Sequence, residues 1–140
     1  GSLCIINKID LKHLIPKDKF DIETAEKLKD YSYEELKTII PQLMEWIQDM
    51  NWPVASVVSD YLTTISEHIQ KEILEIITGD DIMWTYWCLG VVCYNSTDKL
   101  DKAVLTEIER IANEPTAFEI ENEVNEQAID VLKKRHTTHR

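Results

Sequence analysis

Apolar residues recur at intervals of three and four along most of the chain, which is the spacing of one face of an α-helix. Between residues 32 and 49 the pattern is carried by Leu36, Ile39, Ile40, Leu43 and Ile47. The 140 residues include only three glycines and four prolines, too few for a turn-rich β-sandwich or barrel. We therefore expect an all-α protein.

Residue types that cap helices mark where several of these helices begin. Ser32 with Glu35, and Thr116 with Glu119, have the spacing of capping boxes, in which each side chain accepts the other residue's amide. Pro41 lies inside the pattern that Ser32 starts. Its ring should kink or split that helix, because proline lacks an amide donor.

Two further helices are expected between residues 51 and 79. Asn51 is a good N-cap, and Pro53 suits a first turn because its missing amide has no helical partner there. Ser66 should start the next helix, and Gly79 should be the residue just past its end.

The segment Ile82–Tyr94 is apolar almost all round, so we expect it to be the central and most buried helix. Asp80 and Asp81 precede it as caps. Cys88 and Cys93 lie five residues apart, a spacing that on an α-helix turns two side chains away from each other.

Two amphipathic helices should complete the chain. The apolar positions of the first are Leu100, Val104, Leu105, Ile108 and Ile111. Those of the second are Ile120, Val124, Ala128 and Val131. The second helix should fray into a basic tail, residues 133–140. Residues 14–132 then form a single helical-repeat domain, preceded by an extension, residues 1–13, whose first two residues look like a cloning scar.

The expected helix starts are regularly spaced. Ser32, Ser66 and Ser96 are 34 and 30 residues apart, and the intervening starts near Asn51 and Asp81 are again 30 apart. Helix pairs of this length stack in HEAT and tetratricopeptide solenoids. We therefore expect a short irregular α-solenoid of stacked helical hairpins, HEAT-like, with about 6–7 helices, and a compact helical bundle is the alternative.

The formal net charge is −11, and residues 32–132 carry only five Lys or Arg. Proteins that bind nucleic acid need cations to displace phosphate counterions, so we expect no nucleic-acid partner. An acidic body favours a basic protein partner, although plain solubility accounts for the charge equally well.

Cysteine usage and hydropathy indicate a cytoplasmic setting. Cys4, Cys88 and Cys93 form no CxxC pair, and we expect reduced, mostly buried thiols. No signal peptide is evident. The longest uncharged apolar run, "IMWTYWCLGVVCY", has 13 residues and is too short to span a bilayer, so we expect no membrane association.

No residue pattern indicates a metal site. His13 and His68 are isolated, and His136 and His139 lie in the tail, where two histidines would have no fixed geometry. The carboxylates of the last helix are interpreted as a solvated face, because the ExxH partners of di-iron bundles are missing. They are Glu119, Glu123, Glu126 and Asp130. The chain also has no nucleophile elbow and no glycine-rich phosphate loop, so we expect neither catalysis nor a cofactor.

Tryptophan and acidic residues coincide at two inter-helix turns. Exposed tryptophans can anchor a protein partner, and carboxylates select a basic one. The alternative is that both tryptophans pack between repeats and the acids only cap helices. We expect Trp46 and Trp87 in the core. The residues expected at a partner-binding ridge are Asp49, Asn51, Trp52, Asp80, Asp81 and Trp84.

Four segments resemble a bacterial family known as domain of unknown function 5071: "LIPKDKFDIETAEKL", "SYEELKTIIPQLMEWIQDMNWPVA", "GDDIMWTYWCL" and "IERIANEPT". The likeness covers roughly residues 14 to 132, and "QDMNWPVA" is its most specific part. The resemblance implies a HEAT-like helical fold in a cytoplasmic protein and supplies no activity, cofactor or catalytic residue.

The leading hypothesis is a non-enzymatic protein-interaction module, in its sharper form an immunity-type inhibitor that binds a basic partner such as a toxin. Small acidic proteins of such families often resemble immunity proteins, which is an analogy. The alternatives are a HEAT-like nucleic-acid enzyme of the DNA glycosylase type, which would need more cations, and a structural or scaffold subunit. The protein could be a monomer or a homodimer.

Overall fold

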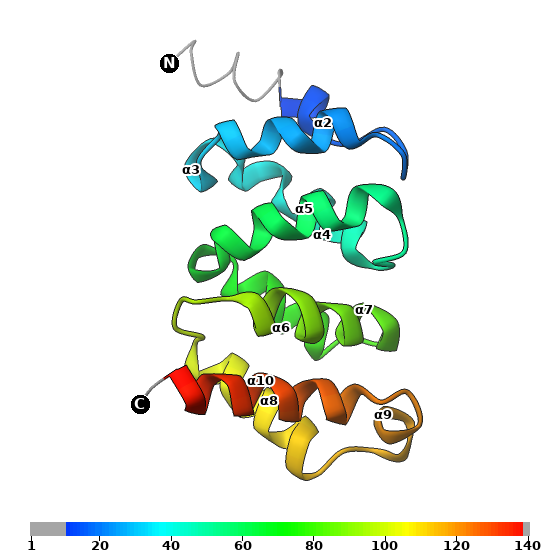
Figure 1. Cartoon of the computed structure of the whole chain (residues 1–140), viewed down its shortest axis with the longest axis vertical. Helices are drawn as coiled ribbons and strands as arrows, with labels where there is room; N and C mark the ends of the chain where they lie inside the picture. The colour runs from blue at the N-terminus through cyan, green and yellow to red at the C-terminus, as the bar shows by residue number, and fades with distance from the viewer. Residues whose placement is uncertain (1–10, 139–140) are drawn as a thin grey trace. The chain divides into compact units, whose positions relative to one another are not determined.

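The computed structural model describes residues 11–138, and all regular secondary structure in this range is helical (Figure 1). The expected all-α class is confirmed. The chain divides into two compact units, Gly1–Ile65 and Ser66–Arg140, which are described separately below as unit 1 and unit 2. A solenoid is defined by how successive hairpins stack across the whole chain, so the HEAT-like arrangement stays a prediction. The expectations for Gly1, Ser2 and Cys4 lie outside the described residues.

Unit 1 consists of short α-helices joined by 3-10 turns. Its elements are η1 (Leu11–Leu14), α2 (Ile22–Glu26), η2 (Lys27–Asp30), α3 (Tyr33–Leu36), η3 (Lys37–Ile39), α4 (Ile40–Met44), η4 (Glu45–Ile47) and α5 (Pro53–Thr64). The large side chains at its centre are fully buried; they include Leu14, Leu28, Leu36, Ile40, Leu43, Ile47 and Leu62. The inward face predicted between residues 32 and 49 is therefore confirmed.

The first long segment of unit 1 begins and breaks as expected. The Ser32 amide donates to Glu35 Oε1 at 2.9 Å, and the Glu35 amide donates to Ser32 Oγ at 3.3 Å, which completes a capping box. Pro41 is in the first turn of α4, where its missing donor costs no helical hydrogen bond. The helix is split at this point by the 3-10 turn η3.

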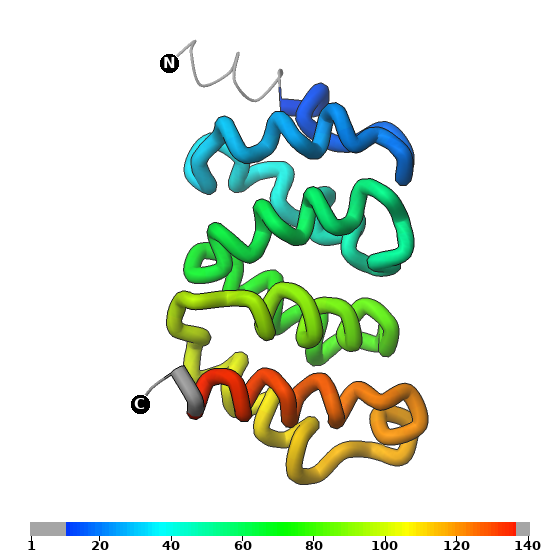
Figure 2. Tube along the Cα trace, viewed as in Figure 1, coloured from blue at the N-terminus to red at the C-terminus, as the bar shows by residue number. Residues whose placement is uncertain are grey.

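The N-cap of α5 is Trp52, so the expectation that Asn51 would cap this helix is wrong. Two hydrogen bonds explain the difference. The Asn51 amide donates to Asp49 Oδ1 at 2.9 Å, so Asn51 belongs to a turn that Asp49 begins and does not act as the cap. The Val54 amide donates to the carbonyl of Lys19 at 3.0 Å, so a distant loop satisfies the orphan donor that a side chain would otherwise take. Figure 2 shows this loop and the start of α5 at the same end of unit 1.

Unit 2 contains α10, the longest helix of the described residues. Its elements are η5 (Ser66–His68), α6 (Gln70–Ile77), α7 (Ile82–Trp87), the π-helix η6 (Cys88–Cys93), α8 (Lys102–Asn113), α9 (Ala117–Glu121) and α10 (Val124–Thr138). Helix α10 packs against α8, η6 and α7. The expected inward positions of α8 and α10 are mostly confirmed, with the following side chains buried: Leu100, Val104, Ile108, Ile111, Val124, Ala128 and Val131.

Ser66 and Ser96 do not start successive α-helices. Ser66 opens the turn η5, α6 begins at Gln70, and α8 begins six residues after Ser96. Instead the two hydroxyls, both buried, form a 2.6 Å hydrogen bond with each other. The side chain of Gln70 joins this cluster. Its Nε2 donates to the Ser66 carbonyl at 2.8 Å, and its Oε1 accepts the backbone amide of Asp101 at 2.7 Å. The spacing of 30 residues thus marks two polar partners rather than two helix starts.

The expectation that Cys88 and Cys93 point away from each other is wrong. An α-helix would separate them by about 140° around its axis, but here the helix widens into a π-helix. Residues five apart then lie almost in line, and the two buried thiols hydrogen-bond each other. Gly90, in the same turn, lies under Gln127 of α10, where any Cβ would collide with that side chain.

The last helix of the chain is divided in two. Glu123 has a φ of 61°, in the left-handed region, and turns the chain between α9 and α10. Ile120 therefore leaves the inward face on which it was expected and is 54% exposed. At the other end, α10 continues through Thr138 instead of fraying after residue 132. Arg135 donates to the Asp98 carbonyl, and Lys134 Nζ lies 4.2 Å from the centre of the Tyr94 ring.

Gly79 directly follows the C-cap Thr78 of α6, as expected, but its φ is not positive. The segment Ile82–Tyr94 is buried on one face only, since Met83 and Tyr94 are among the exposed large side chains. No helix among residues 11–138 combines the length and the apolar character that crossing a bilayer requires.

Candidate partner-binding surface

In unit 1, the turn between η4 and α5 holds three of the predicted residues. Asp49 builds the turn: its carboxylate accepts the Asn51 amide, and its carbonyl accepts the Trp52 amide at 3.2 Å. Trp52 is half-buried and meets Trp46 edge to face, with ring centres 5.6 Å apart. Trp46, expected in the core, is half-buried as well. Asn51 is exposed.

In unit 2, the turn between α6 and α7 holds the other three. Asp81 is the N-cap of α7, and its Oδ1 accepts the Trp84 amide at 3.1 Å. Asp80 does not cap the helix and is exposed, so the expectation that both acids act as caps is wrong for this residue. Thr85 Oγ1 donates to the Ile76 carbonyl at 3.0 Å, which ties α7 to the end of α6. Trp84 is half-buried.

The aromatic side chains of α7 are less buried than expected. Trp87, expected in the core, is half-buried and lies edge to face with Tyr86 at 4.8 Å between ring centres. Met83 is 41% exposed. Apolar side chains of α7 therefore reach the surface beside the exposed Asp80 carboxylate.

Helix α9 adds two exposed apolar residues that the sequence argument missed. Phe118 is 55% exposed, and Ile120 was expected to face inward. A signal was present: Thr116 and Glu119 start a helix, and Asn122, a residue type that often ends one, follows only three positions after Glu119. A helix this short has no room for a complete inward stripe.

Glu119 takes the inward position of α9 in place of an apolar residue. Its two oxygens accept hydrogen bonds from Arg110 at 3.1 Å and 2.6 Å, and Arg110 also pairs with Glu107 at 3.1 Å. Burial raises the pKa of Glu119, but the bonds from Arg110 and Thr116 outweigh this effect and lower it overall. The hydrogen bonds that Arg110 donates to Glu119 and Glu107 raise the pKa of Arg110. Glu119 is thus no part of a solvated stripe, and Glu123, in the turn, does not continue one.

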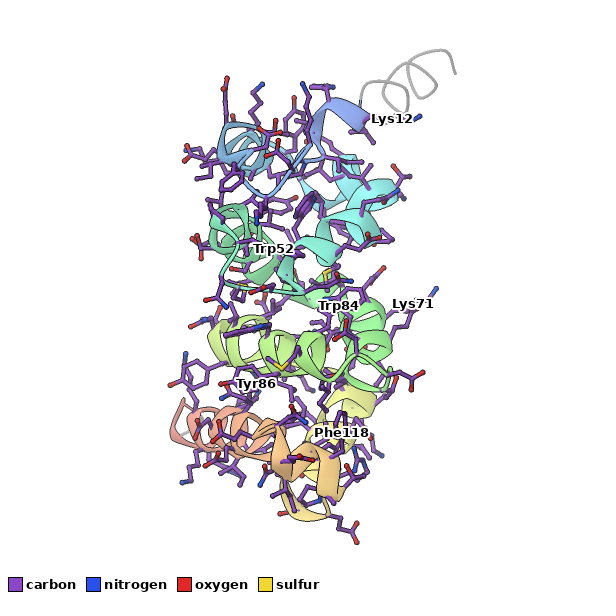
Figure 3. All side chains as sticks on the ribbon, turned by 90° about the vertical axis from the view of Figure 1, so that its right-hand side faces the viewer. Lys12, Trp52, Lys71, Trp84, Tyr86 and Phe118 are labelled. Atoms are coloured by element: carbon purple, nitrogen blue, oxygen red, sulfur yellow. The ribbon has the colours of Figure 1, made fainter. Side chains whose placement is uncertain are left out.

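Unit 2 has an excess of acids, with fifteen Asp or Glu against eight Lys or Arg. Residues 72–98 contain five acids and no Lys or Arg. Residues 103–132 contain eight acids and a single Lys or Arg, Arg110, whose charge is already shared by two carboxylates. The start of α7 and the helix α9 lie at the same end of unit 2 (Figure 1), and Figure 3, which looks at the molecule from that side, labels Trp84, Tyr86 and Phe118.

The predicted residues therefore separate into two groups. Asp49, Asn51 and Trp52 belong to unit 1, and Asp80, Asp81 and Trp84 belong to unit 2. Whether the two turns form one ridge depends on how the units are placed, so that part of the expectation stays a prediction. Within unit 2, the structure adds Phe118 and Ile120 to the end that carries Asp80 and Trp84.

Titratable groups elsewhere form no cluster that could hold a metal ion within the part of the chain that the structure describes. His13 and His68 are exposed, His136 lies in α10, and His139 is outside the described residues. A hydrogen bond to Cys93 and burial both raise the pKa of the Cys88 thiol, which disfavours the nucleophilic thiolate.

A family model described as "Domain of unknown function (DUF5071)" matches residues 14–132. A search of curated proteins found no match to the chain.

Proposed function

The chain belongs to the family described as domain of unknown function 5071, and on this premise we propose that it is a non-enzymatic interaction module that binds a basic protein. The observation that carries the proposal is the excess of acids in unit 2. Eight acids and a single, already paired arginine in residues 103–132 produce a negative field that attracts cations and repels nucleic acid.

The contact residues of this proposal are the acids and tryptophans of the two turns. Asp80 is the best placed of the acids, because it is exposed and does not cap α7. Asp49 and Asp81 have structural hydrogen bonds that a partner would have to leave intact. Trp52 and Trp84 are both half-buried, so the fold restricts each ring while part of it stays accessible to a partner. Because each side chain is already restricted, it loses less conformational entropy on binding.

In its finer form, the proposal is an inhibitor of the immunity type. Its acidic surface would cover the basic cleft of a toxin, such as the phosphate-binding cleft of a nuclease, by charge complementarity. We place this activity in the cytoplasm, where the free thiols of Cys88 and Cys93 would stay reduced.

The test is salt-dependent capture followed by kinetics. The tagged protein is exposed to lysate of its host at low salt and eluted with high salt, and the eluted proteins are identified. We expect a protein of high pI, whose association rate with the purified chain falls about fivefold in Asp80→Lys. Asp60→Lys, the same change at an exposed position of α5, is the matched control and should alter the rate less.

Two outcomes would overturn the proposal. One is the absence of any basic protein in the salt eluate. The other is tight binding of double-stranded DNA in a gel-shift assay at low salt, which would favour a nucleic-acid enzyme instead.

A further inference from the structure

We propose that the end of unit 2 formed by α9 and the first turn of α7 docks a basic amphipathic segment of another protein, with Phe118 as its anchor. This inference rests on the proposed function and names the surface and the kind of partner. The surface comprises Met83 and Trp84 of α7, Phe118 of α9, and the acids Asp80 and Glu114, which all lie at this end of unit 2.

Hydrogen bonds at Thr116 and Glu119 fix the orientation of α9. The capping box of Thr116 and Glu119 starts the helix, with hydrogen bonds of 2.9 Å and 3.1 Å. Glu119 is held on the inner side by two hydrogen bonds from Arg110. Because successive residues turn by about 100°, Phe118 points to one flank of the helix and cannot follow Glu119 inward.

This orientation of α9 leaves the phenyl ring of Phe118 largely in water. Phe118 keeps 55% of its surface in water, although Phe is among the side chains that gain most from burial. The arrangement is understandable when the phenyl ring is covered in a complex, since exposed aromatic residues within a polar rim are typical of binding surfaces.

The charges at this end of unit 2 indicate what kind of partner covers Phe118. Asp80, Glu114 and Glu121 are exposed at this end, while the basic residues Lys134 and Arg135 lie at the other end of α10, against Tyr94 and Asp98. A second copy of the chain in a symmetric dimer would place this acid-rich surface against itself, which is repulsive. An anionic lipid surface is repelled for the same reason. A segment with Lys or Arg around an apolar stripe satisfies both the ring and the carboxylates.

The experiment uses the full chain and two synthetic 18-residue amphipathic helices, one of Lys and Leu and one of Glu and Leu, each with a fluorescent label. Binding is followed by fluorescence anisotropy at low salt. We expect the Lys/Leu peptide to bind and the Glu/Leu peptide not to bind. Phe118→Ala should weaken binding of the Lys/Leu peptide about tenfold, as expected for loss of an aromatic anchor.

The matched control is Phe20→Ala. Phe20 is 67% exposed in unit 1, and Lys19 Nζ lies 5.4 Å from the centre of its ring, so the same truncation removes an aromatic ring next to a cation. This variant should bind the Lys/Leu peptide like the unchanged protein. Both variants should melt within about 2 °C of it, because truncation of an exposed side chain costs little stability.

Three outcomes would overturn the inference: no binding of the Lys/Leu peptide, equal effects of the two truncations, or concentration-dependent dimerisation in light scattering that Phe118→Ala abolishes. The last would assign the surface to a second copy. If the basic protein of the capture experiment binds with the same affinity to Phe118→Ala, the docking surface is wrong while the proposed function stands.

Discussion

Tyr61 is the residue whose titration reports most directly on the packing of unit 1. Its side chain is buried, and its hydroxyl donates to the Tyr31 carbonyl at 3.1 Å, which ties α5 to the loop before α3. Burial, with a smaller contribution from the nearby Glu35 carboxylate, raises the pKa of Tyr61 to about 12 from its usual 10. The folded protein therefore retains this proton at pH values where the unfolded chain has lost it.

The first prediction concerns stability at alkaline pH. Between pH 10 and about 12 the folded state binds more protons than the unfolded state, so the free energy of unfolding should fall as pH rises through this window. Tyr61→Phe should remove this contribution to the slope and, near pH 7, cost about 1 kcal/mol through the lost hydrogen bond. Urea unfolding at a series of pH values measures both effects. An unchanged slope in Tyr61→Phe would assign it to other groups.

At the scale of single helices, prediction from sequence succeeded where the determining contacts are local. Both capping boxes, at Ser32 and at Thr116, form as their spacing indicates, because each requires only four consecutive residues. The cap of α5 was mispredicted because the carbonyl that takes its orphan amide comes from Lys19, which no local pattern reveals.

The predictions for Ser66 with Ser96 and for Cys88 with Cys93 were wrong for related reasons. Ser66 resembles a helix start, but its partner is Ser96, and only the folded chain brings them together. Cys88 and Cys93 were placed by α-helical geometry, whereas the segment adopts a π-helix whose one-turn spacing is five residues. In the candidate site, the turns could be found from the sequence. Phe118 was missed: the short spacing from Thr116 to Asn122 was a signal in the sequence, but the exposure of Phe118 also depends on Glu119 pairing with Arg110 of another helix.

The second prediction separates the two aspartates ahead of α7. Asp81→Ala removes the side-chain acceptor of the Trp84 amide and should lower the free energy of unfolding by about 1 kcal/mol, while Asp81→Ser, which keeps a capping oxygen, should recover most of it. Asp80→Ala should change stability by less than about 0.5 kcal/mol, because Asp80 is exposed and caps no helix. Thermal and urea unfolding provide the comparison. Equal losses in the two alanine variants would show that both acids are structural and would remove Asp80 from the proposed surface.

At the scale of the whole molecule, the excess of acids should act on folding and on binding in opposite directions. A net charge of −11 on 140 residues repels itself in the compact state. Ion pairs such as those of Arg110 with Glu107 and Glu119 offset only part of this repulsion. Added sodium chloride screens this repulsion, so the melting temperature should rise between about 10 mM and 150 mM salt, over which the Debye length shortens from about 30 Å to about 8 Å. The same screening should slow association with a basic partner, because its encounter is driven by the attraction that salt weakens. Melting curves and association rates measured in one salt series test both effects. A melting temperature that rises while the association rate falls shows that attraction is lost and the fold is kept.

A melting temperature that falls with salt would contradict this prediction. It would mean that the Arg110 network contributes more to stability than the acid excess removes. A slower association would then have to be corrected for unfolding before it could support the proposed partner.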